Sequence, residues 1–123
     1  MSMLALLLFS FIHQSHSQGV VLNMFQLAVW YPSFETATSL DLSTRNIVYV
    51  DSNTFSGLTS LVTLRLDNNV ITNIDSATFG DLVNLKELYL RSNKLSYIDS
   101  FAFVNLKSLT TLLLDSNHLT SLN

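Results

Sequence analysis

The strongest constraint on this chain is an internal repeat with a step of 24 residues. One unit reads LVTLRLDNNVITNIDSATFGDLVN from residue 61, and the next reads LKELYLRSNKLSYIDSFAFVNLKS from residue 85. A shorter copy, LTTLLLDSNHLTSLN, begins at residue 109, and a more divergent copy, ATSLDLSTRNIVYVDSNTFSGLTS, begins at residue 37. Units of this size bury their apolar side chains only against neighbouring units, so the repeat predicts a stack of coils with a long open surface.

Each unit begins with a short alternating pattern. Leu64 and Leu66 have the spacing of side chains on one face of a strand, so Thr63, Arg65 and Asp67 are predicted to point the other way. Stacked units then form a parallel sheet with one buried face. The remainder of each unit returns over the opposite side, where we expect a short turn of helix near SATFGDL.

The outward positions of these strands predict one exposed face. Neighbouring strands lie about 4.8 Å apart, so Asp67, Arg91 and Asp115 should form a row of alternating charge, which favours mutual pairing. Tyr and Arg often dominate interfaces, which makes this face a candidate binding surface; a solvated face that neutralises its own charges is the alternative. The candidate residues are Asp41, Arg65, Asp67, Glu87, Tyr89, Arg91, Leu113 and Asp115.

An asparagine follows the strand in each of the last three units: Asn69, Asn93 and Asn117. A buried asparagine needs partners for its amide and its carbonyl, so we expect these side chains to bond the turning main chain and to form a structural ladder between coils. Arg45 stands at this register in the first unit, so the ladder should begin at the second coil. A column of aromatic rings is expected in the core, formed by Phe55, Phe79 and Phe103.

The beginning of the chain differs in composition, because residues 1–34 contain no Asp, Glu, Lys or Arg. The run LALLLFSFI, followed by small residues at Ser15 and Ser17, predicts that residues 1–17 are a secretory signal cleaved before Gln18. The run is too short to span a bilayer, so no membrane span is expected. The alternative is a hydrophobic start of a cytoplasmic chain.

Residues 18–36 are predicted to cap the exposed apolar end of the first coil. The chain has no cysteine, so this cap contains no disulfide. Val20–Tyr31 is rich in Val, Phe, Trp and Tyr, which favour a strand over a helix. Trp30 and Phe34 are expected to be core residues.

Composition favours a non-catalytic chain. The net charge is −3 and the six basic residues are dispersed, which argues against nucleic-acid binding. The sequence contains neither a cluster of histidines for a metal nor a glycine-rich phosphate loop, so no cofactor is expected. Three aspartates recur at one register and are interpreted as a turn or helix-start device: Asp51, Asp75 and Asp99.

The repeated residues resemble the leucine-rich repeat pattern LxxLxLxxNxLxxIxxxxFxxLxx. With phenylalanine in the second half, residues 37–123 are similar to the 24-residue class found in Toll-like receptors, Slit-type guidance proteins and the variable lymphocyte receptors of jawless fish. The resemblance implies an α/β solenoid: a curved parallel sheet on the concave face, with loops or short helical turns on the convex face. The units start at residues 37, 61, 85 and 109, and the last is incomplete.

The resemblance implies a recognition module of a secreted or cell-surface protein, which binds a protein ligand through the concave sheet. An intracellular scaffold or adaptor and an inhibitor of an enzyme are the alternatives, because one fold serves many partners. Neither the paired cysteines of the usual N-terminal cap nor a C-terminal cap is found in this sequence. A genuine disulfide-free cap, an aberrant gene model and a fragment of a longer receptor are the alternatives. The isolated chain is expected to self-associate through the uncapped C-terminal edge.

Overall fold

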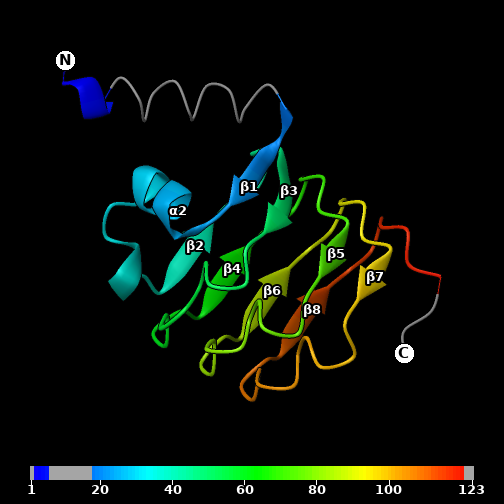
Figure 1. The fold of residues 1–123 in the computed structure, drawn as a ribbon. Coiled ribbons are helices and arrows are strands. Elements are labelled where there is room, and N and C mark those ends of the chain that lie inside the picture. Colours follow the sequence, from blue (N-terminus) through cyan, green and yellow to red (C-terminus); the bar gives the residue numbers. More distant parts are fainter. Residues whose placement is uncertain (1, 6–17, 121–123) are drawn as a thin grey trace.

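The computed structural model describes residues 2–5 and 18–120, and it forms a stack of coils (Figure 1). The predicted signal segment and its cleavage site lie largely outside the described residues. The cap contains strand β1 (Val20–Leu22), helix α2 (Met24–Trp30) and the 3-10 turn η1 (Phe34–Thr36). The coils contain β2 (Ser39–Asp41), β3 (Ile47–Val50), β4 (Thr63–Arg65), β5 (Asn73–Ile74), β6 (Glu87–Tyr89), β7 (Tyr97–Ile98) and β8 (Thr111–Leu113).

The main sheet is parallel, with the strand order β2-β4-β6-β8. Its register follows the repeat: Leu40, Leu64, Leu88 and Leu112 are partners across the sheet. The first three of these leucines are fully buried, and Leu112 is half-buried. The predicted solenoid with one buried sheet face is therefore confirmed. We call the outward surface of this sheet the concave face.

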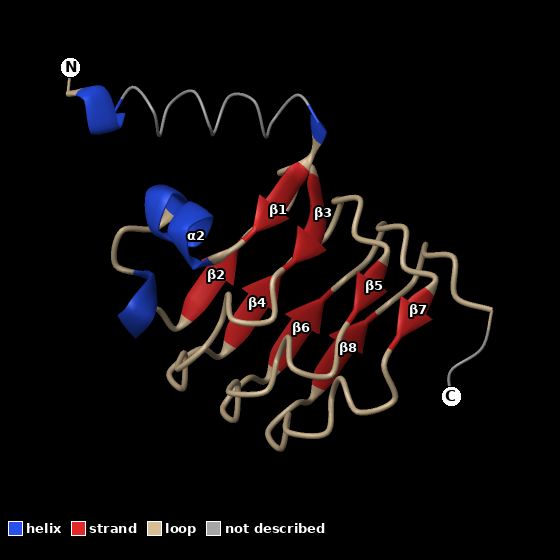
Figure 2. Ribbon diagram, viewed as in Figure 1, coloured by secondary structure: helices blue, strands red, loops and turns tan. Residues whose placement is uncertain are grey.

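The opposite side of the stack carries two short parallel pairs, β1-β3 and β5-β7 (Figure 1). Figure 2 shows loops between the strands of the coils, and the expected helix near SATFGDL is instead a series of turns. The N–H of Gly80 donates to the carbonyl of Ala77 at 3.2 Å, and the N–H of Leu82 donates to Phe79 at 3.2 Å. Single turns of this kind return the chain over the core without a regular helix.

Two columns of side chains fill the space between the two sides. The leucines and isoleucines of the first two coils, and the leucines of the third, are buried, since each coil covers the apolar residues of its neighbour. The predicted aromatic column is present: the ring centroids of Phe55 and Phe79 lie 6.2 Å apart, as do those of Phe79 and Phe103, with the rings close to parallel. Phe55 and Phe79 are buried, whereas Phe103 in the third coil is half-exposed.

The cap differs from the strand that its composition predicts. Only Val20–Leu22 is extended, and residues 24–30 form helix α2. The helix begins after Asn23, whose side chain accepts the N–H of Gln26 at 2.9 Å, as an N-cap residue does. Phe34 is buried as predicted, and Trp30 is half-buried against the core.

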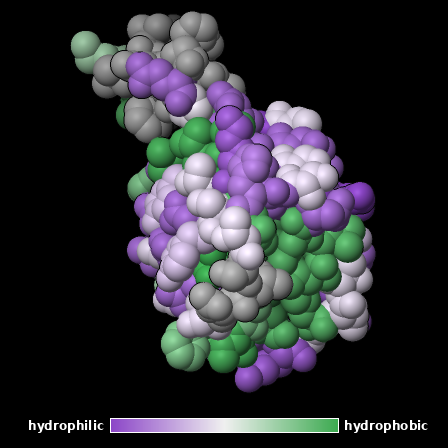
Figure 3. All heavy atoms as spheres, turned by 90° about the vertical axis from the view of Figure 1, so that its right-hand side faces the viewer, coloured by the Kyte–Doolittle hydropathy of each residue, from purple (hydrophilic) through white to green (hydrophobic). Residues whose placement is uncertain are grey.

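The opposite end of the described stack presents apolar side chains. Figure 3 views the molecule from this end and shows a broad hydrophobic area over the last coils. The half-buried residues packed against the core there include Leu109, Leu112, Leu114 and Leu119. They are half-buried because no coil within the described residues lies beyond them.

Candidate functional site

The concave face carries the columns read from the sequence. Asp41, Arg65, Tyr89 and Leu113 are partners across the four strands of the main sheet, so their side chains form one row. Glu87 lies in the neighbouring row, opposite Thr63. The alternation within each strand places these side chains outward, because the leucine between them is directed into the core.

A cation–aromatic stack lies at the centre of this face. The guanidinium carbon of Arg65 lies 4.1 Å from the centroid of the Tyr89 ring, a geometry that is attractive for both groups. The Tyr89 hydroxyl donates to Glu87, and the Thr63 hydroxyl donates to the other oxygen of Glu87 at 3.2 Å. The tyrosine is therefore held from two sides before any ligand binds.

The row of alternating charge pairs differently from the prediction. The Arg91 guanidinium lies 2.9 Å from the carboxylate of Asp115, as expected for an ion pair. Asp67, however, pairs with Arg65 of its own coil at 3.7 Å and accepts the main-chain N–H of Arg91 at 2.8 Å. Asp67 is thus tied to the main chain of the next coil, and its interaction with Arg91 does not use the guanidinium.

A second aromatic group lies at the cap end of the concave face, and the sequence analysis did not single it out. The Arg45 guanidinium carbon lies 4.4 Å from the Trp30 ring centroid and 5.7 Å from that of Tyr31. The Tyr31 hydroxyl donates to the carbonyl oxygen of Asp41 at 2.6 Å. Cap and first strand are therefore joined by a group of aromatic and basic side chains, formed by residues outside the repeat pattern.

Hydrogen bonds and nearby charges shift the pKa values of three groups on this face. Hydrogen bonds from Ser43, with smaller contributions from Arg65 and Arg45, lower the pKa of Asp41 below its ordinary value. The hydrogen bond from Tyr89 lowers the pKa of Glu87, and the same bond raises the pKa of Tyr89. Both carboxylates are therefore charged at neutral pH, and Tyr89 remains a neutral hydrogen-bonding group.

Comparison with known proteins supports the same fold. Residues 59–119 match the family model described as leucine rich repeat. The chain belongs to the leucine-rich repeat family. Among solved structures, it resembles a chain of the Toll–Spatzle complex from Drosophila, with 40% sequence identity and a TM-score of 0.63. The similarity covers 64% of this chain and 10% of that chain, so the present sequence spans about a tenth of its length. A comparison with curated protein sequences found no match.

The leucine-rich repeat strands end at residues with left-handed backbone. Thr44, Asn68, Ser92 and Ser116 share one register and have φ between 53° and 59°. This conformation turns the chain away from the sheet while the N–H still bonds the next coil: Asn68 N–H, for example, donates to the carbonyl of Arg91 at 3.0 Å. Asparagine adopts such angles readily, whereas threonine does so rarely, so the turn is imposed by the stacking of the coils.

The three asparagines that share one register of the repeats make structural contacts. The Asn69 Oδ1 accepts the N–H groups of Arg45 and Ile47 at 3.0 and 3.1 Å, and its Nδ2 donates to the carbonyls of Leu42 and Leu66 at 2.9 Å each. These partners belong to its own coil or to the coil before it. The side chains do not bond one another, and the ladder runs through the main chain.

Asn93 and Asn117 repeat this arrangement. Asn93 accepts the N–H of Ile71 at 3.2 Å, and Asn117 accepts the N–H of Leu95 at 3.0 Å. Asn69 and Asn93 are each 5% exposed, whereas Asn117 is half-exposed. Among the described residues none of the three side chains bonds the following coil, so each asparagine links its own coil to the coil before it.

The structure also shows the hydrogen-bond partners of the recurring aspartates. Asp51 and Asp99 accept main-chain N–H groups two residues later, which is a turn device, as predicted. Asp75 accepts the Tyr49 hydroxyl at 2.5 Å and so connects two coils. Within the described part of the chain, no three His, Cys, Asp or Glu side chains are grouped so that they could hold a metal ion. None of the helices described is long and apolar enough to cross a membrane.

Proposed function

We propose that this chain is a non-catalytic recognition module that binds a protein ligand through the concave face. The observation that supports the proposal best is the ordering of the Arg65–Tyr89 stack. Tyr89 is fixed by Glu87 and by Arg65, and Glu87 is fixed by Thr63. Side chains that are already ordered lose little conformational entropy on binding, and Tyr and Arg are the residues that most often dominate interfaces.

The arrangement of the face favours a protein over a small molecule. Its polar groups extend along four strands as a row of aromatic, charged and apolar side chains, from Asp41 to Leu113. Standard protein interfaces use extended surfaces of this kind, whereas small ligands bind in enclosed cavities. The similar Drosophila structure is a complex of Toll with Spatzle, which supports a protein partner for the present module as well.

The location that fits this role is extracellular, in a secreted protein or in the ectodomain of a receptor. The apolar run and the two serines of residues 1–17 support secretion. Expression of the full chain in animal cells with N-terminal sequencing of the product tests this point. A mature protein in the medium that begins at Gln18 supports secretion, whereas a cytosolic protein that keeps Met1 excludes it.

Binding is tested with a matched pair of tyrosine variants. The full chain is screened by biolayer interferometry against a collection of secreted protein domains, and each binder is measured again with Tyr89→Ala and with Tyr97→Ala. Tyr97 is exposed on β7, on the opposite side of the stack, and serves as the control. A central anchor contributes about 2 kcal/mol or more, so Tyr89→Ala should weaken binding roughly thirtyfold.

The result that contradicts the proposal is equally definite. A ligand whose affinity falls with Tyr97→Ala and is unchanged with Tyr89→Ala binds the opposite side. In that case the concave face is a solvated surface that neutralises its own charges. Arg65→Ala independently tests whether the stack contributes to ligand binding, because it removes the stacked cation and leaves the Tyr89 hydroxyl bonded to Glu87.

A further inference from the structure

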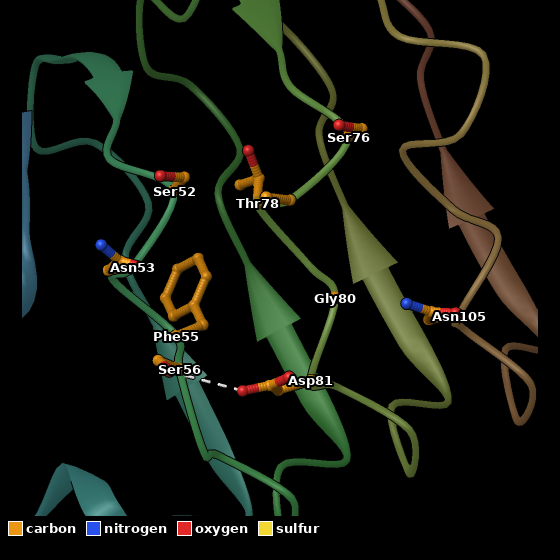
Figure 4. A pocket seen from close by; sticks show the side chains of 10 residues that line it. Ser52, Asn53, Phe55, Ser56, Ser76, Thr78, Gly80, Asp81 and Asn105 are labelled. Atoms are coloured by element: carbon orange, nitrogen blue, oxygen red, sulfur yellow. Dashed lines mark hydrogen bonds between the residues drawn. The ribbon is translucent and has the colours of Figure 1, made fainter.

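A hollow of about 320 Å³ opens on the side opposite the concave face (Figure 4). We call it the convex hollow. Its walls come from three successive coils: Ser52 and Ser56 from the first, Ser76 and Asp81 from the second, and Asn105 from the third. The loops that carry these residues pass side by side, and the second-coil loop at Gly80 runs between the first-coil residues and Asn105.

The convex hollow exists because the middle coil has two very small residues there. Ala77 and Gly80 line it, and the following coil has Phe101 and Val104 at the same two registers. The backbone does not require glycine at position 80: a Cβ added there would meet only the Ala77 carbonyl at 3.5 Å and the Asn105 amide nitrogen at 3.8 Å, which are ordinary contacts. A larger residue would fit, and its absence leaves the space open.

The lining determines the chemistry of a ligand. Serine hydroxyls, asparagine amides and one carboxylate surround the space, and no Lys, Arg or His is among the lining residues. A phosphate or sulfate would meet a carboxylate without a compensating cation, which is unfavourable. A single carboxylate is also a poor site for Ca²⁺, which takes six to eight oxygens. A neutral ligand with many hydroxyl groups fits best, since hydroxyls both donate and accept.

One group in the hollow is already oriented. The Asp81 Oδ2 accepts the N–H of Gly57 at 2.8 Å and the hydroxyl of Ser56 at 3.4 Å. Within the described residues this leaves Oδ1 available to accept from a ligand hydroxyl. A carboxylate that is fixed in this way binds a hydroxyl without a further loss of side-chain entropy, and a charged acceptor gives a stronger hydrogen bond than a neutral one.

Aromatic carbon lies beside these polar groups. Phe55 contributes atoms to the lining, but its ring is 2% exposed and packs on Phe79 in the aromatic column, so it does not offer a face to a ligand. Phe101 occupies the register of Ala77 in the next coil, which also supplies Asn105; it is 65% exposed and lies outside the residues that line the hollow. A pyranose ring has an apolar C–H face in addition to its hydroxyls, and such a face packs favourably on an aromatic side chain.

We propose that the convex hollow binds one neutral pyranose unit of a glycan. Asp81 accepts a sugar hydroxyl, the serines and Asn105 bond the neighbouring hydroxyls, and the exposed ring of Phe101 covers the C–H face. The volume lies at the lower end of the range for ligand sites, so it admits one sugar unit rather than an extended chain. The site lies opposite the concave face, and it does not depend on the protein-binding function proposed above.

The test uses the full ¹⁵N-labelled chain and records amide chemical shifts during titration with methyl β-D-glucopyranoside and, separately, with N-acetyl-D-glucosamine. We expect saturable shifts with millimolar affinity at Ser52, Ser76, Gly80 and Asn105 for at least one of the two sugars. Inorganic phosphate at the same concentrations should give no such shifts, since the hollow has no cation.

Two variants fill the hollow with residues that the next coil already carries at these registers, Gly80→Val and Ala77→Phe. Each should abolish the shifts, and Tyr89→Ala on the concave face should leave them unchanged. Two independent variants are used so that a folding defect in one, detected by circular dichroism, leaves the other decisive. The proposal is overturned if neither sugar produces saturable shifts, if phosphate binds as well as sugar, or if binding persists in a folded variant with the filled hollow.

Discussion

Replacement of Asn93 by alanine tests the reasoning about the asparagine ladder. The side chain is 5% exposed and accepts the N–H of Ile71 at 3.2 Å, while its amide donates to the carbonyls of Leu66 at 3.0 Å and Leu90 at 3.3 Å. Each of these carbonyls also accepts from a neighbouring asparagine, so it keeps one bond. The Ile71 N–H loses its acceptor, and one unpaired buried donor costs about 1–3 kcal/mol.

The expected losses of stability at the other two asparagines can be compared with this value. Asn69 accepts two main-chain N–H groups, from Arg45 and Ile47, so Asn69→Ala should cost more, about 2–4 kcal/mol. The amount is below twice the single value because Arg45 is half-exposed and water reaches its amide. Asn117 is itself half-exposed, so Asn117→Ala should cost about 1 kcal/mol or less.

Urea unfolding followed by far-ultraviolet circular dichroism measures these differences. Asn105→Ala is the control, because Asn105 is exposed in the same fold and is outside the ladder register. We expect losses in the order Asn69, Asn93, Asn117, with little change in the control. If Asn93→Ala is as stable as the control, or if Asn117→Ala loses more stability than Asn69→Ala, the losses do not follow from the buried N–H groups that are left without an acceptor.

Three further predictions concern single contacts. Thr54 is buried and donates its hydroxyl to a cap carbonyl at 2.8 Å, whereas the buried Thr78 hydroxyl has no partner among the described residues. Thr54→Val should therefore cost about 1 kcal/mol in urea unfolding and Thr78→Val should be neutral or stabilising; equal losses would contradict this. Phe79→Ala removes a fully buried ring from the aromatic column and should cost about 3–5 kcal/mol, visible as a large fall in the thermal midpoint, and a small fall would show that the column collapses to fill the space. Glu87→Gln should bring the pKa of Tyr89 back toward 10.0 in an ultraviolet titration of the phenolate, and an unchanged titration would exclude the bond. Because the pKa of Tyr89 is raised in the folded wild type, the stability from this bond is present below the pKa of the unfolded state and is lost as the pH rises through the pKa of the folded state.

The main sheet and its columns could be predicted because each position recurs at the same spacing. Thr63 and Glu87, or Arg65 and Tyr89, are partners in the structure because they occupy equal positions in successive units. The repeat fixes the residue that lies beside another across the sheet, independently of the propensity of a single segment. The candidate face therefore follows from the sequence at the level of backbone position.

The contacts made by long surface side chains could not be predicted in the same way. The sequence places Asp67 beside Arg91, and yet Asp67 pairs with Arg65 and with a main-chain N–H. Exposed charged side chains have several rotamers of similar free energy, and exposed pairs contribute little, so the column alone does not select the partner. The stack of Arg65 on Tyr89 depends on the same rotamer choices.

Helix α2 was missed because it lies outside the repeat. Asn23 and Gln26 lie within the apolar run Val20–Tyr31 and stand three residues apart, as the first and last residues of a capping box do. That spacing is the signal that could have revealed the helix. The composition of the segment, rich in Val, Phe and Trp, concealed it because local propensity is a weak guide when tertiary contacts decide.

The backward direction of the asparagine bonds has a consequence for the order in which the coils form. The turn of one coil obtains its acceptor only from the coil that follows: Asn93 closes the turn at Ile71, and Asn117 closes the turn at Leu95. During synthesis from the N-terminus, the amide of each turn is therefore protected from solvent exchange only after the asparagine 22 residues later has been made. Opening of the coil that carries Asn117 exposes the Leu95 amide, so fraying proceeds toward the cap, one coil at a time.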